Sequence, residues 1–389
     1  MKQIKIFLST LLITLISFSL LIPGTVFADA LSDALSMDVS NINIGTILVP
    51  ANPETESDTL AMQLLGLSSG YTAESSSYVF QTAGLDVLEQ VNYEKDDNDS
   101  SHTCAFTIGK GTVYAGLSPK EALVISIRGT YAAEWYSNFD FSPSHTDDSP
   151  FADNFLFCAE DAFLTLQKYM EEYPDALILI CGHSRGGACA NLLGLLVNSY
   201  TDSQKVYTYT FAAPCTVKST TALPDYPNIF NFLNPCDLVP NLPLKNWGFV
   251  RAGTDIYLQN EDAISAVVSS FITTLSDLAP SIDSYYNEQH SIIHNDSMEI
   301  SISSFELMLM FSKWLTAMTV ESSDSAGADD IESMISEEDF KTMISDSDFE
   351  PLAKLLEELS ANDYELGKLL LMQHLPATYL ELLTAKYNQ

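Results

Sequence analysis

ALILICGHSRGGACANLLGLLVN, residues 176–198, is the stretch that decides the fold of this chain. Its apolar beginning is typical of a buried parallel strand, and small and apolar residues resume at helical spacing after residue 186. Between them, GHSRG (residues 182–186) has glycine on both sides of a serine, as a sharp turn between a closely packed strand and helix requires. We predict a strand, a tight turn that exposes Ser184, and a helix.

The segments around this stretch repeat the same alternation. Residues 122–127, 206–213 and 229–233 have the composition of buried strands, and residues 152–173 have apolar positions at helical spacing until Pro174 ends the pattern. Strands separated by helical segments of this length indicate parallel crossover connections. The predicted fold class is therefore α/β, with a mostly parallel central sheet flanked by helices.

Other segments give local predictions. We expect a short helix over residues 58–66, a strand over 104–108 that ends at Gly109, a pair of strands within 248–258, and a helix over 304–318. Residues 78–93 show mixed apolar patterns that favour neither a helix nor a strand.

The first 28 residues have the pattern of a secretory signal peptide. Lys2 and Lys5 precede an apolar run that reaches Ile22, and Ala28 and Ala30 supply small residues for cleavage. The apolar run approaches the length of a membrane span, so an uncleaved anchor is the alternative. We expect a secreted protein, with cell-surface association as a further option.

The composition divides the rest of the chain into two parts. Residues 31–319 are the predicted α/β domain, which contains Ser184. Residues 320–389 begin acidic and serine-rich and end in amphipathic segments. We interpret the second part as a solvated linker followed by a small helical C-terminal appendage.

Charge and cysteine spacing exclude several classes of partner. The formal net charge of −35 repels nucleic acid, and the six cysteines show no C-x-x-C or similar metal-ligand spacing. We therefore predict no nucleic acid, metal or cofactor. Most cysteines are expected to be buried thiols, although Cys215 and Cys236 both follow predicted strands and could pair as a disulfide.

Ser184 needs a base and an acid to become a nucleophile. A serine hydroxyl is a weak nucleophile at neutral pH. Where the serine lies in a sharp turn between a strand and a helix, the acid and then the histidine follow it along the chain. Asp237 lies directly after the predicted strand 229–233 and is the preferred acid, whereas Asp225 lies before that strand and is a weaker substitute.

Three histidines follow Asp237. His294 is the preferred base and His290 the alternative, because both lie in one segment before a strong predicted helix, where a loop can bring the ring to Ser184. His374 lies in an amphipathic C-terminal segment, and we interpret it as a partly buried helix residue. His183 is expected to point away from the nucleophile as a packing or supporting residue.

Acyl transfer also needs two donors for the developing oxyanion. The backbone N–H groups of Arg185, after the nucleophile, and of Thr130, after the predicted strand 122–127, are the candidates.

Five motifs in order resemble those of the fungal-type (class three) lipase family, which has the α/β-hydrolase fold. They lie within residues 58–314: VISIRGT (124–130), Trp135 in EWYSNFDF, GHSRGG (182–187), YTFAAP (209–214) and NPCDLVPNLP (234–243). The resemblance implies that Ser184 is the nucleophile, Asp237 the acid, a histidine near residues 290–294 the base, and Thr130 with Arg185 the oxyanion hole.

This sequence departs from the family pattern in three ways. Family members usually carry leucine where Arg185 stands, the loop after Thr130 is polar, and the segment after His294 lacks the tyrosine usually found a few residues on. The polar loop leaves both lipids and short-chain esters open as substrates.

The resulting functional prediction is a serine hydrolase of carboxylic esters, triacylglycerol lipase-like, that contacts lipid surfaces peripherally if at all. One alternative is a catalytically silent surface or binding protein on the same scaffold. A peptidase or acyltransferase with the same site is another.

Overall fold

The structure is a computed structural model. It describes residues 42, 44–93, 104–129, 151, 153–218, 224–242, 249–260, 264–266, 268–269, 272–273 and 372–388. Ala34–Ser265 and Met372–Gln389 form one compact unit, and Met1–Asp33 with Ala266–Leu371 form the other. Across the described residues, no helix has both the length and the hydropathy that crossing a membrane would take. The predicted signal peptide and the residues at 304–318 lie outside the described part.

An eight-stranded sheet, as counted in the described residues, runs through the middle of the first unit. The strands lie in the order β1-β3-β4-β5-β6-β8-β10, and β2 pairs with β3. Their bounds are β1 (Leu48–Val49), β2 (Leu85–Val91), β3 (Phe106–Ala115), β4 (Ser118–Ile127), β5 (Leu177–His183), β6 (Val206–Phe211), β8 (Ile229–Leu233) and β10 (Thr254–Tyr257). From β4 to β10 all neighbours are parallel, whereas β2, β3 and β4 are antiparallel. The α/β prediction is confirmed.

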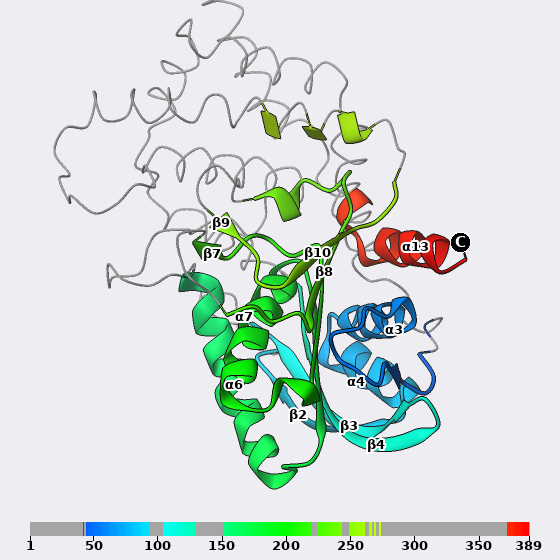
Figure 1. Cartoon of the computed structure of the whole chain (residues 1–389), viewed down its shortest axis with the longest axis vertical. Coiled ribbons are helices and arrows are strands. Elements are labelled where there is room, and N and C mark those ends of the chain that lie inside the picture. The colour runs from blue at the N-terminus through cyan, green and yellow to red at the C-terminus, as the bar shows by residue number, and fades with distance from the viewer. Residues whose placement is uncertain are drawn as a thin grey trace, which may run out of the picture. The chain divides into compact units, whose positions relative to one another are not determined.

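Helices cover both faces of this sheet (Figure 1). On one face lie α3 (Asp58–Ser68) and α4 (Ala73–Thr82), with α13 (Pro376–Tyr387) packed against α3. On the other lie α6 (Asp153–Glu172) and α7 (Arg185–Tyr200). A separate two-stranded sheet pairs β7 (Val217–Lys218) with β9 (Phe249–Val250), and the 3-10 helices are η3 (Ser203–Lys205) and η4 (Val239–Asn241).

Side-chain caps define where the first two helices begin. The Ser57 hydroxyl accepts the Leu60 N–H at the start of α3. Thr72 and Ser75 exchange hydrogen bonds at the start of α4 as a capping box. Both helices therefore start at fixed positions and bury their apolar sides on the sheet.

The register of the parallel strands brings their carboxyl ends together. Ile127 at the end of β4 pairs with Gly182 of β5, and Phe211 at the end of β6 pairs with His183 of β5. Residues that follow β4, β5, β6 and β8 therefore meet at one edge of the sheet, which is where open α/β sheets place their sites.

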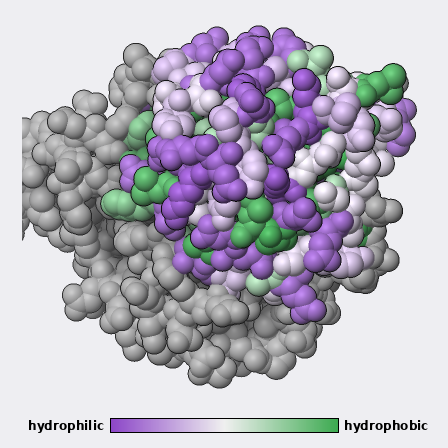
Figure 2. Space-filling view, turned by 90° about the horizontal axis from the view of Figure 1, so that it is seen from below, coloured by the Kyte–Doolittle hydropathy of each residue, from purple (hydrophilic) through white to green (hydrophobic). Residues whose placement is uncertain are grey.

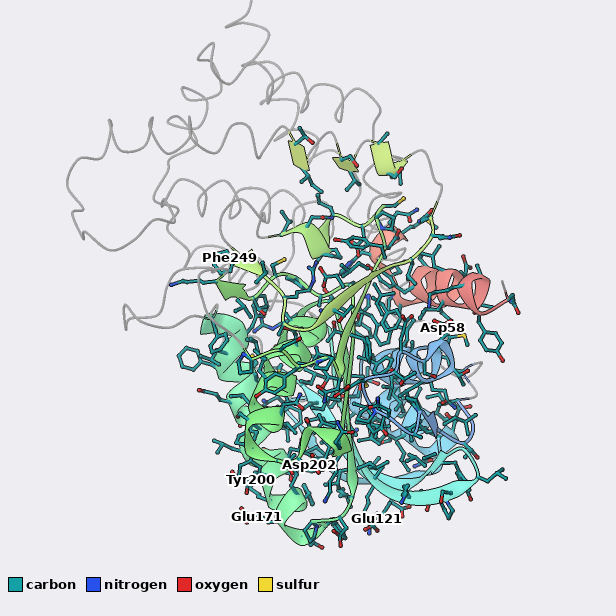
Figure 3. The ribbon with its side chains drawn as sticks, viewed as in Figure 1. Asp58, Glu121, Glu171, Tyr200, Asp202 and Phe249 are labelled. Carbon is teal, nitrogen blue, oxygen red and sulfur yellow. The ribbon has the colours of Figure 1, made fainter. Side chains whose placement is uncertain are left out.

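The other edge, where the parallel strands begin, is polar. Figure 3 shows Glu121 near the start of β4 and Glu171 near the end of α6, both at the lower end of the ribbon. Figure 2 looks onto this end from below, and hydrophilic residues dominate its described part, with only small separate hydrophobic areas. The net charge of −35 is consistent with such a surface.

The structure extends or alters several predicted elements. The predicted 104–108 strand is the longer β3, which passes through Gly109 because β2 and β4 pair with it on both sides. The unassigned residues 78–93 form the end of α4 and β2. Within the predicted pair at 248–258, β9 joins the small sheet and β10 extends the main one.

The C-terminal helix departs from the predicted domain boundary. Residues 320–389 are expected to be a linker with an appendage, and the helical end is present as α13. However, Met372–Gln389 belongs to the same compact unit as the sheet, and Tyr379 and Leu383 are fully buried within it. These last residues therefore complete the core instead of forming a separate body.

Candidate active site

Ser184 lies in the predicted turn between β5 and α7. Its backbone is in the left-handed region, with φ 56° and ψ −125°, which is strained for a residue other than glycine. A Cβ on Gly186 would lie 2.2 Å from the Ile127 carbonyl oxygen, and a Cβ on Gly182 would lie 2.1 Å from the Gly186 carbonyl oxygen. The two glycines therefore allow the close approach of β4, β5 and α7 that places Ser184 at this edge, as the G-x-S-x-G pattern predicts.

Ser184, His374 and Asp237 form a continuous hydrogen-bonded chain. The distance between Ser184 Oγ and His374 Nε2 is 2.8 Å, and that between His374 Nδ1 and Asp237 Oδ2 is also 2.8 Å. A carboxylate only accepts hydrogen bonds, so Nδ1 carries the proton of the neutral ring and Nε2 accepts from the serine hydroxyl. All three residues are buried, which strengthens these electrostatic contacts.

The turn after β8 holds Asp237 in a fixed orientation. Its Oδ1 accepts the Val239 N–H at 3.0 Å, and its Oδ2 also accepts the Tyr379 hydroxyl at 2.8 Å. Burial and the neighbouring Asp237 raise the pKa of Tyr379 well above its usual value, so the phenol stays protonated and donates. Both oxygens of the acid are thereby directed, and one faces the histidine.

His374 is held through the backbone on either side of it. The Asn234 side-chain amide donates to the Gln373 carbonyl at 2.9 Å, which ties the β8 turn to the C-terminal segment. His183 Nε2 donates to the His374 carbonyl at 2.8 Å, and its Nδ1 faces the Tyr71 hydroxyl at 3.4 Å. Burial, and secondarily His374, hold the pKa of His183 well below its usual value, so this ring is neutral. His183 thus supports the site, in agreement with its predicted role.

The Arg185 side chain turns into the protein interior. Its guanidinium lies 5.7 Å from the centre of the Phe155 ring, and its Nη2 donates to Cys158 Sγ at 3.5 Å. Its backbone N–H opens the first turn of α7, where N–H groups have no partner within the helix and favour negative charge. The second predicted oxyanion donor, Thr130, lies outside the described residues.

The histidine that hydrogen-bonds to Ser184 and Asp237 differs from the one that the sequence favoured. His290 and His294, the predicted bases, lie outside the described residues. His374, interpreted as a partly buried helix residue, is buried and in addition bridges Ser184 and Asp237, a contact that was not predicted from the sequence. The sequence does contain a signal for His374. Tyr379 stands a few residues after it, as the tyrosine of the family pattern does after the family's histidine, whereas no such tyrosine follows His294.

The cysteines that the structure describes are all buried and free. Cys215 and Cys236 therefore do not pair. Three others, Cys104, Cys158 and Cys189, have sulfur atoms within 4.8 Å of one another and are a group with metal-ligand character. Their separation along the chain hides this cluster from any search for short ligand spacings.

Comparison with known proteins gives one family. The sequence model of the class 3 lipases matches residues 124–247, from β4 to the segment before β9, and this span contains Ser184 and Asp237. The chain is 25% identical over 191 residues to the secreted mono- and diacylglycerol lipase A of Penicillium cyclopium, and equally to that of Penicillium camembertii. Each match covers 46% of this chain and 59% of the relative's length.

Solved lipase structures are also similar over part of the chain. The Rhizomucor miehei lipase in complex with its propeptide is 18% identical, with a TM-score of 0.40, and the match covers 51% of this chain and 66% of that one. The lipase of Rhizopus microsporus var. chinensis is 16% identical, with a TM-score of 0.38 and coverages of 57% and 86%. The family resemblance that the motifs indicated is confirmed: over residues 124–247 this chain is similar to the class 3 lipases.

Proposed function

We propose that this protein is a serine hydrolase that cleaves carboxylic esters of lipids. The observation that carries the proposal is the chain of hydrogen bonds from Ser184 Oγ through the His374 ring to Asp237. In this constellation a histidine takes the serine proton and a buried carboxylate orients and stabilises the ring that receives it. The function expected from the sequence is retained, with His374 proposed as the base in place of His294 or His290.

The first half of the reaction forms an acyl-enzyme. As Ser184 Oγ attacks the ester carbonyl, its proton passes to His374 Nε2, and Asp237 stabilises the imidazolium through Nδ1–H. His374 then gives this proton to the departing alcohol oxygen. Tyr379 keeps Asp237 Oδ2 in place throughout, because its hydroxyl donates to that oxygen.

The second half releases the acid. Water takes the place of the alcohol, and His374 removes its proton as it attacks the acyl carbonyl. When the tetrahedral intermediate collapses, His374 gives this proton to Ser184 Oγ, and the acid is released. The negative oxygen of each tetrahedral intermediate is expected to accept the Arg185 N–H at the start of α7, with Thr130 as the proposed second donor. Removing one such donor typically costs 10²–10³ in kcat.

Acylglycerols are the proposed substrate class. The Penicillium relatives are named secreted mono- and diacylglycerol lipases, which supports these esters, contact with lipid surfaces and an extracellular location for this protein. The matched region covers only 59% of their length, so their substrates do not establish the substrate of this protein, which has to be measured. Mono-, di- and triacylglycerols should be compared with p-nitrophenyl esters of increasing acyl length.

The decisive experiment compares histidine variants of the purified protein. We expect Ser184→Ala and His374→Ala each to lower kcat for a p-nitrophenyl ester by about 10³-fold or more, as removal of a triad member does. His290→Ala and His294→Ala are the matched controls and should stay within a few-fold of wild type. If His294→Ala lost activity and His374→Ala stayed fully active, His294 would be the base, as the sequence favoured, and His374 would not. A folded wild type that neither turns over esters nor reacts with a fluorophosphonate would favour the silent scaffold.

Secretion has its own test. Expression in a secreting host should give an extracellular protein whose first residue, read by N-terminal sequencing, follows Ala28 or Ala30. Deletion of residues 2–28 is the control and should keep the protein inside the cell. Recovery of the intact N-terminus in the membrane fraction would instead support the uncleaved anchor.

A further inference from the structure

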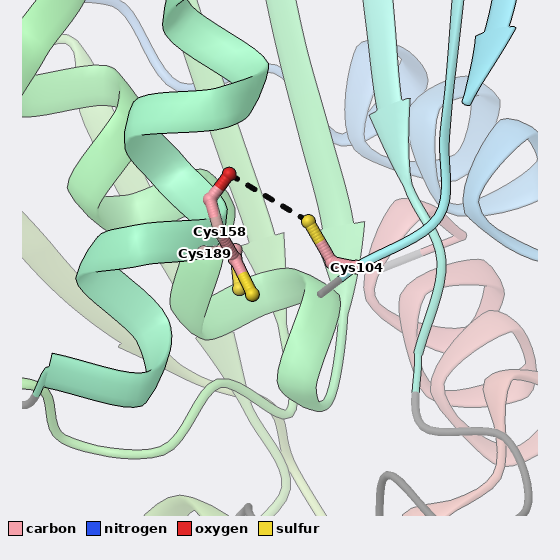
Figure 4. Close-up of side chains that lie close together, drawn as sticks. All are labelled: Cys104, Cys158 and Cys189. Carbon is pink, nitrogen blue, oxygen red and sulfur yellow. Dashed lines mark hydrogen bonds between the residues drawn. The ribbon is translucent and has the colours of Figure 1, made fainter. Parts of the chain in front are cut away.

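Three thiols from distant parts of the chain converge beside α7. Cys104 lies two residues before the start of β3, Cys158 lies on α6 and Cys189 lies on α7, and their sulfur atoms are all within 4.8 Å of one another. Figure 4 shows the Cys158 and Cys189 side chains next to each other on neighbouring helices, with Cys104 facing them from the strand side. Each residue is at most 1% exposed. The fold therefore brings three sulfur atoms together in a buried cluster.

A positive charge borders this cluster. The Arg185 guanidinium donates to Cys158 Sγ at 3.5 Å, and Cys104 Sγ donates to the Cys158 backbone carbonyl at 3.7 Å. Cys181 is an equally buried cysteine outside the cluster. A cation beside a cysteine favours the thiolate, which is the form that binds metals.

We propose that Cys104, Cys158 and Cys189 form a binding site for one soft metal ion, copper(I), in three-coordinate thiolate geometry. A metal–sulfur bond is about 2.3 Å long, so a central ion separates its sulfur ligands by about 4 Å, close to the spacing present. Soft thiolate ligands select copper(I) or zinc(II), and closed structural zinc(II) sites almost always have four protein ligands. The cluster comprises three donors from the described His, Cys, Asp and Glu side chains, which suits copper(I).

Arg185 offsets part of the charge of a loaded site. Coordination displaces the thiol protons to solvent, and three thiolates with one copper(I) carry a net charge of −2. The buried Arg185 guanidinium, which donates to Cys158 Sγ at 3.5 Å, offsets one of these charges and fixes a ligand from outside the metal sphere. Copper stays in its reduced state, so no electron acceptor is needed.

The consequence for the fold is a clamp on the helix that carries the nucleophile. The ion would join the start of β3 to α6 and α7, and Ser184 directly precedes α7. Because the ion binds only the folded arrangement, it should raise the thermal midpoint in proportion to the logarithm of its free concentration.

The test is a titration of the reduced full-length protein with copper(I), without oxygen, against a chromophoric copper(I) chelator. We expect one ion per chain, with binding weakened at least 100-fold in Cys158→Ser and Cys189→Ser. Cys181→Ser is the matched control and should bind as wild type does. Circular dichroism and fluorophosphonate labelling of Ser184 verify that each variant is folded.

Two further measurements make the outcome decisive. X-ray absorption of the loaded protein should give a first shell of three sulfur atoms, and loading should raise the thermal midpoint of wild type but not of Cys158→Ser. A first shell with two or four sulfurs, unchanged affinity in both cysteine variants, or zinc(II) binding in preference to copper(I) would overturn the proposal. So would a loss of two mass units without bound metal, which would mean that two of the thiols form a disulfide.

Discussion

Among single residues, His183 has an unusual position for a titratable group. It lies next to Ser184, and yet its ring is fully buried and donates to the backbone of His374 instead of joining the hydrogen-bonded chain of Ser184, His374 and Asp237. Because burial holds its pKa well below the ordinary value, the folded protein keeps this ring neutral, whereas the unfolded chain protonates it below about pH 6.5.

This difference predicts a pH-dependent stability. Below about pH 6.5 unfolding takes up a proton at His183, so the free energy of unfolding should fall as the pH falls, by up to about 1.4 kcal/mol per pH unit from this residue. Above that pH the contribution of His183 to the free energy of unfolding no longer changes with pH. Urea denaturation of wild type and His183→Gln between pH 7 and 5 measures the effect. The variant should show the shallower decline, and equal slopes would contradict the prediction.

The three residues of the proposed triad differ in how far the sequence could locate them. Ser184 and Asp237 are each marked by neighbours in the chain, a glycine-flanked turn and a turn directly after a strand. His374 is marked by nothing comparable, because its amphipathic surroundings also predict ordinary packing on a helix. What distinguishes it is contact with residues 190 and 137 positions away, which no local pattern contains.

Among the elements, the junction of β4, β5 and α7 is the most constrained. The predicted strand, turn and helix were confirmed there because the turn admits few residues. The β3 and β4 hairpin was harder to predict, since Gly109 resembles a strand end until the pairing on both sides is known. Local sequence therefore identified the elements with strict steric needs better than those that depend on their neighbours.

Gly186→Ala tests the steric need directly. The added Cβ would meet backbone oxygens of Ile127 at 2.2 Å and Arg128 at 2.6 Å, and neither can move without distorting β4. We expect a loss of at least about 3 kcal/mol in the free energy of unfolding, or no folded protein. Gly116→Ala is the control: its φ of 63° costs about 1–2 kcal/mol, but the space around it is open. Urea denaturation measures both, and equal losses would contradict the steric argument.

On the scale of the whole molecule, Met372–Gln389 returns to the unit formed by Ala34–Ser265. Composition placed a boundary at residue 320, because the acidic segment differs so clearly from what precedes it. Composition could not indicate that Met372–Gln389 packs back on the sheet unit, since burial of Tyr379 and Leu383 depends on α3 and the β8 turn.

A truncated chain tests this arrangement. A protein that ends at Leu375 keeps His374 but lacks α13 and with it the Tyr379 hydroxyl that donates to Asp237. We expect fluorophosphonate labelling of Ser184 at least tenfold slower than wild type and a lower thermal midpoint, because a buried apolar side chain such as Leu383 alone contributes about 1.5–3 kcal/mol. A protein that lacks only Gln389 is the control. Labelling at the wild-type rate in the shorter chain would show that α13 does not position the base.

The placement of His374 has an architectural consequence. Asp237 and His374 are 137 positions apart, and both are anchored in the sheet unit, so what lies between them joins two fixed points. The entropy of closing such a connection grows only with the logarithm of its length, and doubling it costs about 0.6 kcal/mol. We therefore expect a change in chain length after β10 and before Met372 to leave the hydrogen bonds among Ser184, His374 and Asp237 intact.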